Sequence, residues 1–370
     1  MAKPVIVVGG GPIGCMLAIF LASEDHQVKI YEGRKDIRES PPDGNRNINL
    51  LINEKGLVAL KEVGCDVGEF TRPINQKLYH DGDRVIRKKE VKLWTAQRQT
   101  LTETLLNTAE KLENITIFFE HKLEKADLKN QVFTFKHCDK LVEVRASFTF
   151  GCDGVHSTVR KYMIEEAHDQ IQEYEIESPI KVTSFRIPSL NQEDPLSPQL
   201  HVWEQEESCM VAIPNIRDHS FTANLFITKE KLGTIKAKPY DFISANFPFM
   251  RGCTDMEYIK SRMEEFYPLY DVDFPPCEVY NTFVLGDAAH TAVPKYGEIM
   301  VMNEGLQNCL LFYKCLQSKS DLSSAINEYI CQQKNVVPVQ TYELDNLSEM
   351  ESSGEDHTSE STSDSSSSLT

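Results

Sequence analysis

The residues with the clearest chemical potential are three glycines near the start of the chain. Gly9, Gly11 and Gly14 fit the pattern G-x-G-x-x-G. In this pattern the first glycine allows a tight turn, the second lets the backbone approach a diphosphate, and the third lets a helix pack closely against a strand. The helix that follows such a turn points free N–H groups at phosphate oxygens. The three glycines therefore predict a site for the diphosphate of a dinucleotide.

The segments around these glycines are those of a βαβ unit. A β-branched run at 5–8 precedes them, an apolar helical stretch at 15–23 follows, and a second strand at 27–31 leads to Glu32. An acid at the end of this strand accepts hydrogen bonds from a ribose 2′-hydroxyl and disfavours the 2′-phosphate of NADP. The run at 5–8 has the composition of a central strand in a parallel sheet. We therefore predict a Rossmann-like domain that binds NAD or FAD.

Two later segments share one form, an apolar strand that ends in a turn with glycine and aspartate. Residues 148–150 lead to Asp153, and residues 283–285 lead to Asp287. A carboxylate at such a strand end can bind a sugar or ribityl hydroxyl, although aspartate is also a common turn former. Both interpretations stay open for the two residues.

Composition limits the classes of function. The chain has 370 residues, 41% of them hydrophobic and 26% charged, with a net charge of −17. These values are typical of a globular enzyme, and the acidic excess argues against nucleic acid as a partner. The ten cysteines show no C-x-x-C pair and no zinc-ligand spacing, so we expect reduced thiols, no metal site and a cytoplasmic location. No apolar stretch reaches the roughly 18 residues that a membrane span needs.

The expected fold class is α/β, with a Rossmann-like nucleotide-binding domain and a second domain built on an antiparallel sheet. We place the nucleotide-binding domain at 1–175 and 278–346 and the antiparallel-sheet substrate domain at 176–277. Residues 351–370 carry serine, threonine and acidic residues but no aromatic residue, lysine or arginine. Such a segment cannot bury enough apolar surface to fold, so we predict a disordered acidic tail.

Taken together, the motifs resemble those of the FAD-dependent aromatic hydroxylases, the single-component flavoprotein monooxygenases. The resemblance extends from Val5 to about Asn346 and is strongest for the members that hydroxylate kynurenine. It implies bound FAD, with NADPH as a transient co-substrate because the chain has no second G-x-G-x-x-G. It also implies oxygen transfer to L-kynurenine, which gives 3-hydroxykynurenine. The segments that carry the resemblance are Tyr31 to Arg34, Arg46 to Leu50, Gly151 to Arg160 and Leu285 to His290.

The resemblance also implies roles for single residues. Ile13 and Gly14 would hold the diphosphate and Glu32 the adenosine ribose, while Lys77 stands where the family has an arginine for the substrate carboxylate. His156 and His290 are interpreted as structural, so no catalytic side chain is predicted. The remaining implied cofactor contacts are Arg34, Leu51, Arg98, Leu123, Asp153, Asp287, Met302 and Asn303.

Three of these assignments have plainer alternatives. Arg98 could form a surface ion pair, since most exposed arginines do no more. Leu123, expected at the end of the strand after Asn114, could serve core packing alone. Lys77 could be an ordinary solvated lysine on a strand.

The chain departs from the family pattern in the loop that faces the flavin. Where the family has G-x-G-M-N, this chain reads from Gly297 to Asn303 with β-branched residues in place of the second glycine. One alternative is therefore an FAD-binding pseudoenzyme or truncated isoform. A second is a carrier like the GDP-dissociation inhibitors, which share the glycine-rich opening. The family resemblance would also place the protein on the cytosolic face of the mitochondrial outer membrane.

Overall fold

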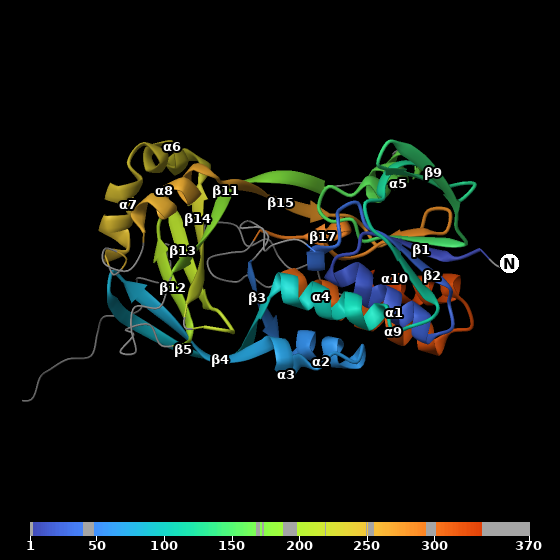
Figure 1. Cartoon of the computed structure of the whole chain (residues 1–370), viewed down its shortest axis with the longest axis horizontal. Coiled ribbons are helices and arrows are strands. Elements are labelled where there is room, and N and C mark those ends of the chain that lie inside the picture. Colours follow the sequence, from blue (N-terminus) through green and yellow to red (C-terminus); the bar gives the residue numbers. More distant parts are fainter. Residues whose placement is uncertain are drawn as a thin grey trace, which may run out of the picture.

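The computed structural model describes residues 3–39, 48–167, 171, 174–187, 198–218, 220–248, 250, 255–293 and 301–334. Its described strands form three sheets, which we call sheet A, sheet B and sheet C. Sheet A and its helices lie at one end of the elongated molecule, and most of sheet B lies at the other (Figure 1). Helix α4 (Arg98–Ala109) and strand β3 (Asn49–Asn53) lie between these two ends.

Sheet A is a five-stranded parallel sheet with the order β16-β10-β1-β2-β6. The prediction of a central, buried first strand is confirmed, because β1 pairs in parallel with β2 on one side and β10 on the other and is buried at every residue. The carboxyl ends of parallel strands meet at one edge of the sheet, where ligands bind in open α/β folds. Its strands are β1 Val5–Val8, β2 Val28–Tyr31, β6 Ile115–Phe118, β10 Phe148–Gly151 and β16 Thr282–Val284.

Helices cover both faces of sheet A because successive strand residues point to opposite sides. Val5 and Val7 join the apolar cluster with α1, α4 and α9, whereas Ile6 and Val8 pack with α5 and sheet C. The helical segments of this part are α1 Pro12–Ser23, η1 Ile37–Glu39, α2 Glu54–Glu62, α3 Val67–Phe70, α4 Arg98–Ala109, α5 Thr158–Ala167, η3 Gly286–Ala288, α9 Val301–Ser318 and α10 Leu322–Lys334.

Sheet C is a three-stranded antiparallel sheet of β7 Lys122–Asp127, β8 Val132–His137 and β9 Lys140–Arg145. The predicted place of Leu123 is wrong: the strand after Asn114 is β6, which ends at Phe118, and Leu123 lies on β7. The intervening turn carries Glu120 at a φ of 58°. The pattern of apolar residues does not mark this turn, so the sequence does not show that β6 and β7 are separate strands.

Sheet B has nine strands in the order β17-β15-β11-β14-β13-β12-β4-β5-β3. The expected antiparallel sheet is confirmed in β11 to β14, but β4 pairs in parallel with β12. Strands β3 to β5, which the sequence analysis assigns to the nucleotide-binding domain, belong to this sheet. The domain boundaries themselves stay a prediction. The strands are β3 Asn49–Asn53, β4 Thr71–Asp81, β5 Arg84–Gln97, β11 Tyr174–Ile187, β12 Leu200–Gln205, β13 Ser208–Pro214, β14 Phe221–Thr228, β15 Tyr267–Asp273 and β17 His290–Thr291.

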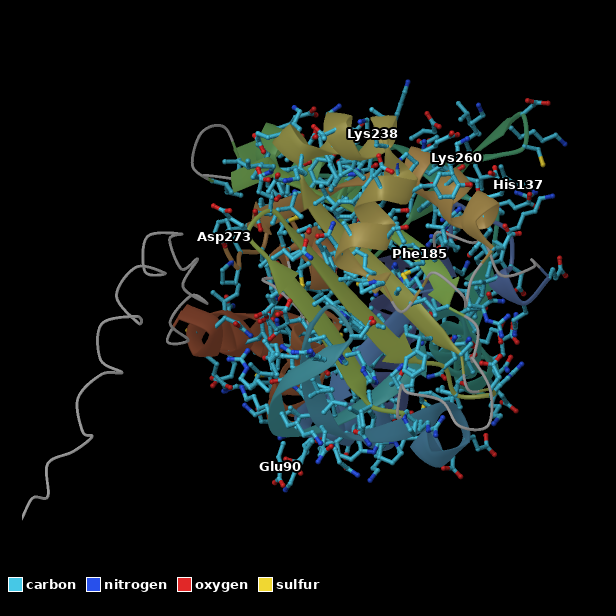
Figure 2. All side chains as sticks on the ribbon, turned by 90° about the vertical axis from the view of Figure 1, so that its left-hand side faces the viewer. Glu90, His137, Phe185, Lys238, Lys260 and Asp273 are labelled. Atoms are coloured by element: carbon cyan, nitrogen blue, oxygen red, sulfur yellow. The ribbon has the colours of Figure 1, made fainter. Side chains whose placement is uncertain are left out.

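The two faces of sheet B have different neighbours. One face packs through Phe185, Trp203 and Met210 against α6 Lys229–Ala237, α7 Pro239–Asn246 and α8 Met256–Glu264. Figure 2 looks at this end of the molecule, with Lys238 and Lys260 in the helical layer and Glu90 at the far edge of the sheet. The other face, which we call the inner face, holds the apolar cluster that includes Leu51 of β3, Tyr79, Val202, Val211 and Phe226.

Among the described residues, no helix is both long and apolar enough to cross a membrane. The same residues contain no group of three or more side chains arranged to hold a metal ion. The cellular location stays a prediction. The loop at 294–300, the motif residues Arg46 and Asn47, and the acidic tail at 351–370 lie outside the described residues.

Candidate cofactor site

The glycine turn between β1 and α1 leaves room for a ligand at one of its three glycines. A Cβ on Gly9, whose φ is 105°, would lie 2.3 Å from the carbonyl oxygen of Cys152. A Cβ on Gly14 would lie 1.9 Å from the carbonyl oxygen of Gly9, so both positions exclude any side chain. A Cβ on Gly11 would meet nothing within 4 Å.

Gly11 is also the N-cap residue of α1, and no side chain caps this helix. Its first-turn N–H groups, which include those of Ile13 and Gly14, therefore have no side-chain acceptor at this cap. The turn is built as a diphosphate site requires, with two glycines needed for packing and one facing open space.

Glu32 lies at the end of β2 and is 7% exposed. One carboxylate oxygen accepts the Gly10 N–H at 2.7 Å, and the other accepts the Arg34 N–H at 2.9 Å and its Nε at 2.7 Å. Burial raises the pKa of Glu32, but the hydrogen bonds from Arg34 and from Gly10 outweigh it and hold the pKa below its usual value. The carboxylate is therefore ionised and fixed beside the glycine turn. The oxygen bound by Gly10 has only one further contact, at 3.4 Å from Nη2 of Arg34, so it is the oxygen that a ribose hydroxyl can reach.

Asp153 follows β10 but turns its carboxylate toward α5. It accepts hydrogen bonds from the Ser157 hydroxyl at 2.5 Å, the Thr158 N–H at 2.7 Å and the Val159 N–H at 3.2 Å. These are the contacts of a helix cap, and they satisfy N–H groups that the first turn leaves free. The turn-forming alternative thus accounts for its side chain, and a direct cofactor contact stays a prediction.

Asp287 differs from Asp153 in its surroundings. It lies in η3 directly after β16, and no hydrogen bond reaches its carboxylate from the residues that the structure describes. Burial raises the pKa of Asp287, while the positive charge of Arg98 opposes that rise, as does His290. Arg98 begins α4, and its N–H donates to the carbonyl of Ile48 at 3.1 Å. The fold therefore brings the charge of Arg98 near an aspartate that is far away in the sequence, and this carboxylate can still accept ligand hydroxyls.

Asn303, on α9, uses its whole amide to hold β3. Its Nδ2 donates to the Leu51 carbonyl at 2.7 Å, and its Oδ1 accepts the Asn53 N–H at 2.9 Å. It is 1% exposed, and a Cβ on Gly56 would lie 2.4 Å from its Oδ1. Any cofactor contact of Asn303 or its neighbour Met302 would therefore involve other atoms than this amide. Leu51 is buried on the inner face of sheet B.

Two polar side chains beside Leu51 were not predicted as site residues. Asn49 on β3 and Thr95 on β5 are 1% and 0% exposed. The Oδ1 of Asn49 and the Oγ1 of Thr95 are buried without a hydrogen-bond partner among the described residues. Thr95 lies directly opposite Leu51 in the β3–β5 pair, and Asn49 lies two residues before Leu51, so all three share one face. Unpaired buried acceptors are costly, which fits polar groups of a bound ligand at this place. Asn49 belongs to the motif from Arg46 to Leu50, whereas Thr95 gave no signal in the sequence.

The two remaining predicted residues lie apart from the glycine turn. Leu123 is 5% exposed within the apolar cluster of Tyr31, Phe133 and Phe135, so core packing accounts for its position. Lys77 is 7% exposed on β4, which contradicts the solvated-lysine alternative. Its Nζ lies 4.9 Å from the ring centroid of Tyr79 on the inner face. The described residues provide no carboxylate partner for it, so this buried ammonium can receive an anionic group.

The histidines near the two Gly/Asp turns have structural neighbours. His156 lies 3.6 Å from Glu175 and packs edge-on against Tyr270. The Nε2 of His290 lies 3.0 Å from the Nδ2 of Asn308 and 3.9 Å from Glu304. These contacts agree with a structural role for both residues.

The described residues fit FAD. The open space beside Gly11 suits the diphosphate, Glu32 suits a ribose, Asp287 has free acceptors, and the unpaired acceptors of Asn49 and Thr95 lie on the face turned toward this region. The carboxyl edge of sheet A and the inner face of sheet B together frame the site. The glycine turn and Glu32 suit any dinucleotide, and the acceptors of Asp287, Asn49 and Thr95 provide partners for the flavin half.

Comparison with solved structures agrees with this fold. Over 89% of this chain and 83% of the other, it superposes with a TM-score of 0.69 and 16% identity on p-nitrophenol 4-monooxygenase PnpA from Pseudomonas putida DLL-E4. Over 90% and 92% it superposes with a TM-score of 0.69 and 15% identity on pqsL, a probable FAD-dependent monooxygenase from Pseudomonas aeruginosa.

Comparison with sequences is more specific. Residues 2–317 match the family model described as FAD binding domain. The chain is 30% identical to a kynurenine 3-monooxygenase of Drosophila willistoni over 88% of this chain and 74% of the relative. It is 29% identical to those of Phaeosphaeria nodorum, over 89% and 74%, and Sus scrofa, over 88% and 71%. The chain therefore belongs to the FAD-dependent aromatic hydroxylases, the flavoprotein monooxygenases with an FAD binding domain, in the group of the kynurenine 3-monooxygenases.

Proposed function

We propose that this protein uses FAD and NADPH to hydroxylate L-kynurenine to 3-hydroxykynurenine. The main support is the similarity to kynurenine 3-monooxygenases along 88% of the chain. The family match at residues 2–317 includes the strands of sheet B as well as the glycine turn. The buried, unpaired ammonium of Lys77 adds chemical support, because a kynurenine-like substrate carries a carboxylate. Lysine provides the charge that this carboxylate needs, although without the planar two-pronged donor of arginine.

In this proposal the side chains bind and orient while the cofactor provides the redox chemistry. When bound, FAD would supply the redox chemistry that links hydride from NADPH to transfer of one oxygen atom of O₂ to the aromatic ring, with the other oxygen leaving as water. The glycine turn and the first turn of α1 hold the diphosphate, Glu32 holds the adenosine ribose, and Asp287 with Arg98 holds the second half of the cofactor.

The inner face of sheet B would form the opposite wall of the substrate site. It is apolar through Val202, Val211 and Phe226, so it excludes water from the reacting ring. Lys77 would place the substrate by its carboxylate. No histidine or carboxylate of this chain is assigned a proton-transfer role, because His156 and His290 have structural partners and Asp287 is assigned to the cofactor.

The test is a turnover assay with the FAD-loaded protein. We expect L-kynurenine to accelerate NADPH oxidation and 3-hydroxykynurenine to appear by mass spectrometry. Lys77→Gln should raise the KM for kynurenine about tenfold, the loss typical of one charge-assisted contact, and leave the FAD content unchanged. The control is Lys89→Gln, since Lys89 is the exposed cross-strand partner of Lys77 on β5. A protein that retains FAD but forms no product with kynurenine would contradict the proposal.

The second candidate is an FAD-binding protein without hydroxylase turnover. The sequence from Gly297 to Asn303 favours it, because β-branched residues replace a glycine that the family uses in the flavin-facing loop. The same assay separates the two: this candidate predicts a stable flavin spectrum with no rate increase on addition of kynurenine.

A further inference from the structure

A second binding region lies where α4 meets the end of sheet B, outside the residues assigned above. Here a cavity of about 420 Å³ opens between the two elements. Its wall on the α4 side consists of Gln97, Gln99, Thr100 and Glu103. The opposite wall comes from β11, the β13–β14 turn, β14 and α8, and consists of Ser184, Phe185, Arg186, Asn215, Arg217, Asp218, Thr222 and Tyr258.

The cavity adjoins the cofactor site through consecutive residues. Gln97 and Gln99 line it, while the positive charge of Arg98, between them, acts on the pKa of Asp287 in the cofactor site. The unpaired carbonyl of Asn49 is also close, because the Nδ2 of Asn49 donates to the Oδ1 of Asn215 in the cavity wall at 2.7 Å. A molecule in the cavity would therefore lie next to Arg98 and Asn49 of the cofactor site, and Lys77 is not among the residues that line the cavity.

The wall opposite α4 carries two arginines and one aspartate, so it has one positive charge left over, and the one carboxylate of the α4 wall is Glu103. Asp218 is neutralised by Arg186 and also accepts the Ser220 N–H at 3.0 Å. Glu103 accepts a hydrogen bond from Gln99 at 2.8 Å. Arg217 is exposed and has no ion pair or hydrogen bond with the residues that the structure describes.

A second arginine borders the same wall. The Nη1 of Arg72 donates to the carbonyl of Asn215 at 3.4 Å, and no described carboxylate pairs with Arg72. In a chain of net charge −17, two guanidinium groups beside one cavity wall that form no ion pair with the described residues are unusual. Guanidinium groups bind phosphate in the bidentate geometry that makes arginine the preferred phosphate ligand.

We propose that this cavity binds the phosphate-bearing part of the reduced pyridine dinucleotide, with Arg217 as the principal contact for the 2′-phosphate and Arg72 as a second. The inference rests on the proposed function, which needs a hydride donor that has no glycine turn of its own. The amide and hydroxyl groups of Gln97, Thr100 and Thr222 supply partners for ribose hydroxyls. The exposed ring of Tyr258 supplies a surface on which a base stacks.

The experiment measures binding of non-reducing probes to the FAD-loaded protein by isothermal titration calorimetry. The probes are NADP⁺, NAD⁺ and 2′,5′-ADP. We expect wild type to bind NADP⁺ more tightly than NAD⁺. Arg217→Gln should weaken NADP⁺ and 2′,5′-ADP about tenfold, leave NAD⁺ unchanged, and raise the KM for NADPH without a change in kcat. Arg72→Gln should weaken the same two probes to a smaller degree.

Two further variants guard against indirect effects. Arg217→Lys keeps the charge and should recover most of the affinity for 2′,5′-ADP. Arg145→Gln removes an exposed arginine on β9, outside the cavity, and should bind all three probes as wild type does.

Wild-type binding of 2′,5′-ADP by both Arg217→Gln and Arg72→Gln would overturn the proposal, as would equal affinity of wild type for NADP⁺ and NAD⁺. The outcome is independent of the substrate assigned above. A wild-type protein that forms no 3-hydroxykynurenine but binds 2′,5′-ADP through Arg217 contradicts the proposed function and leaves this site intact. Normal formation of 3-hydroxykynurenine, with Arg217→Gln and Arg72→Gln binding 2′,5′-ADP as wild type does, supports the proposed function and overturns this site.

Discussion

The buried histidine pair of sheet B gives the protein a specific sensitivity to acid. His80 on β4 and His201 on β12 are 7% and 1% exposed, and their ring nitrogens Nε2 and Nδ1 lie 2.8 Å apart. The ring of His80 also stacks on Trp203, with centroids 4.4 Å apart. Burial, together with the neighbouring His201, lowers the pKa of His80 to about 4. The native state therefore holds His80 neutral, whereas the unfolded chain releases it to its ordinary pKa of about 6.5.

The sign and size of the effect follow from these two pKa values. Above about pH 6.5 both states are neutral at His80, and the free energy of unfolding does not depend on this group. Between about pH 6.5 and pH 4 the unfolded state binds the extra proton, so stability falls by about 1.4 kcal/mol per pH unit. The loss is about 2 kcal/mol at pH 5 and about 3 kcal/mol when the pH falls below the native pKa.

Urea unfolding at pH 7.5 and pH 5.0, followed by tryptophan fluorescence, measures this loss. Other groups also titrate in this range, so the comparison is between wild type and His80→Gln, whose amide stays within reach of His201. We expect wild type to lose about 2 kcal/mol more than the variant between the two pH values. His137→Gln, at the end of β8, should behave as wild type. An equal loss in wild type and His80→Gln would refute the reasoning, because burial of His80 would then have no energetic consequence.

Three other predictions concern the cofactor region. Gly14→Ala should abolish retention of FAD, measured as flavin absorbance per mole of protein, because the new Cβ would lie 1.9 Å from the Gly9 carbonyl; Gly233→Ala, where a Cβ meets nothing within 4 Å, is the control. Arg160→Met should lower the free energy of unfolding, measured in urea, by about 3 kcal/mol, because the 2% exposed guanidinium joins the Ala288 and Val155 carbonyls to Glu175. Lys161→Met is the control, and an equally small loss in both variants would contradict this prediction. The Cys15 and Cys309 thiols should react with Ellman's reagent only on unfolding, since burial raises their pKa values and shields them, whereas exposed Cys138 should react at once. Mass spectrometry identifies the labelled cysteines, and labelling of Cys15 or Cys309 in the folded protein would contradict this prediction.

Most of the cofactor half could be predicted from local patterns. The β1–α1–β2 unit, Glu32 at its end, and the strands before Asp153 and Asp287 all lie where the sequence placed them. Glycine spacing and β-branched runs report the conformation of their own few residues, so no distant contact is needed to interpret them. The local patterns predicted a dinucleotide site, and the family resemblance identified the dinucleotide as FAD.

The functions of single polar side chains were harder to predict, because a residue type does not reveal which way its side chain turns. Asp153 and Asp287 have the same sequence context, yet one carboxylate caps α5 and the other has no hydrogen bond among the described residues. Leu123 lies on a different strand from the one expected, and Lys77 is buried where solvent was an equal alternative.

By itself, then, the sequence determined the nucleotide-binding turn and the β1–α1–β2 unit around it, because these rest on residues that lie close together in the chain. It also determined the family, because each of the motifs that carry the resemblance is a short run of residues. Only the tertiary structure decided that β3 to β5 join sheet B, that the charge of Arg98 acts on Asp287, and that a cavity with Arg217 opens beside α4. The physical reason is that strand pairing and side-chain burial depend on the register and packing of segments far apart in the sequence, which no local pattern contains.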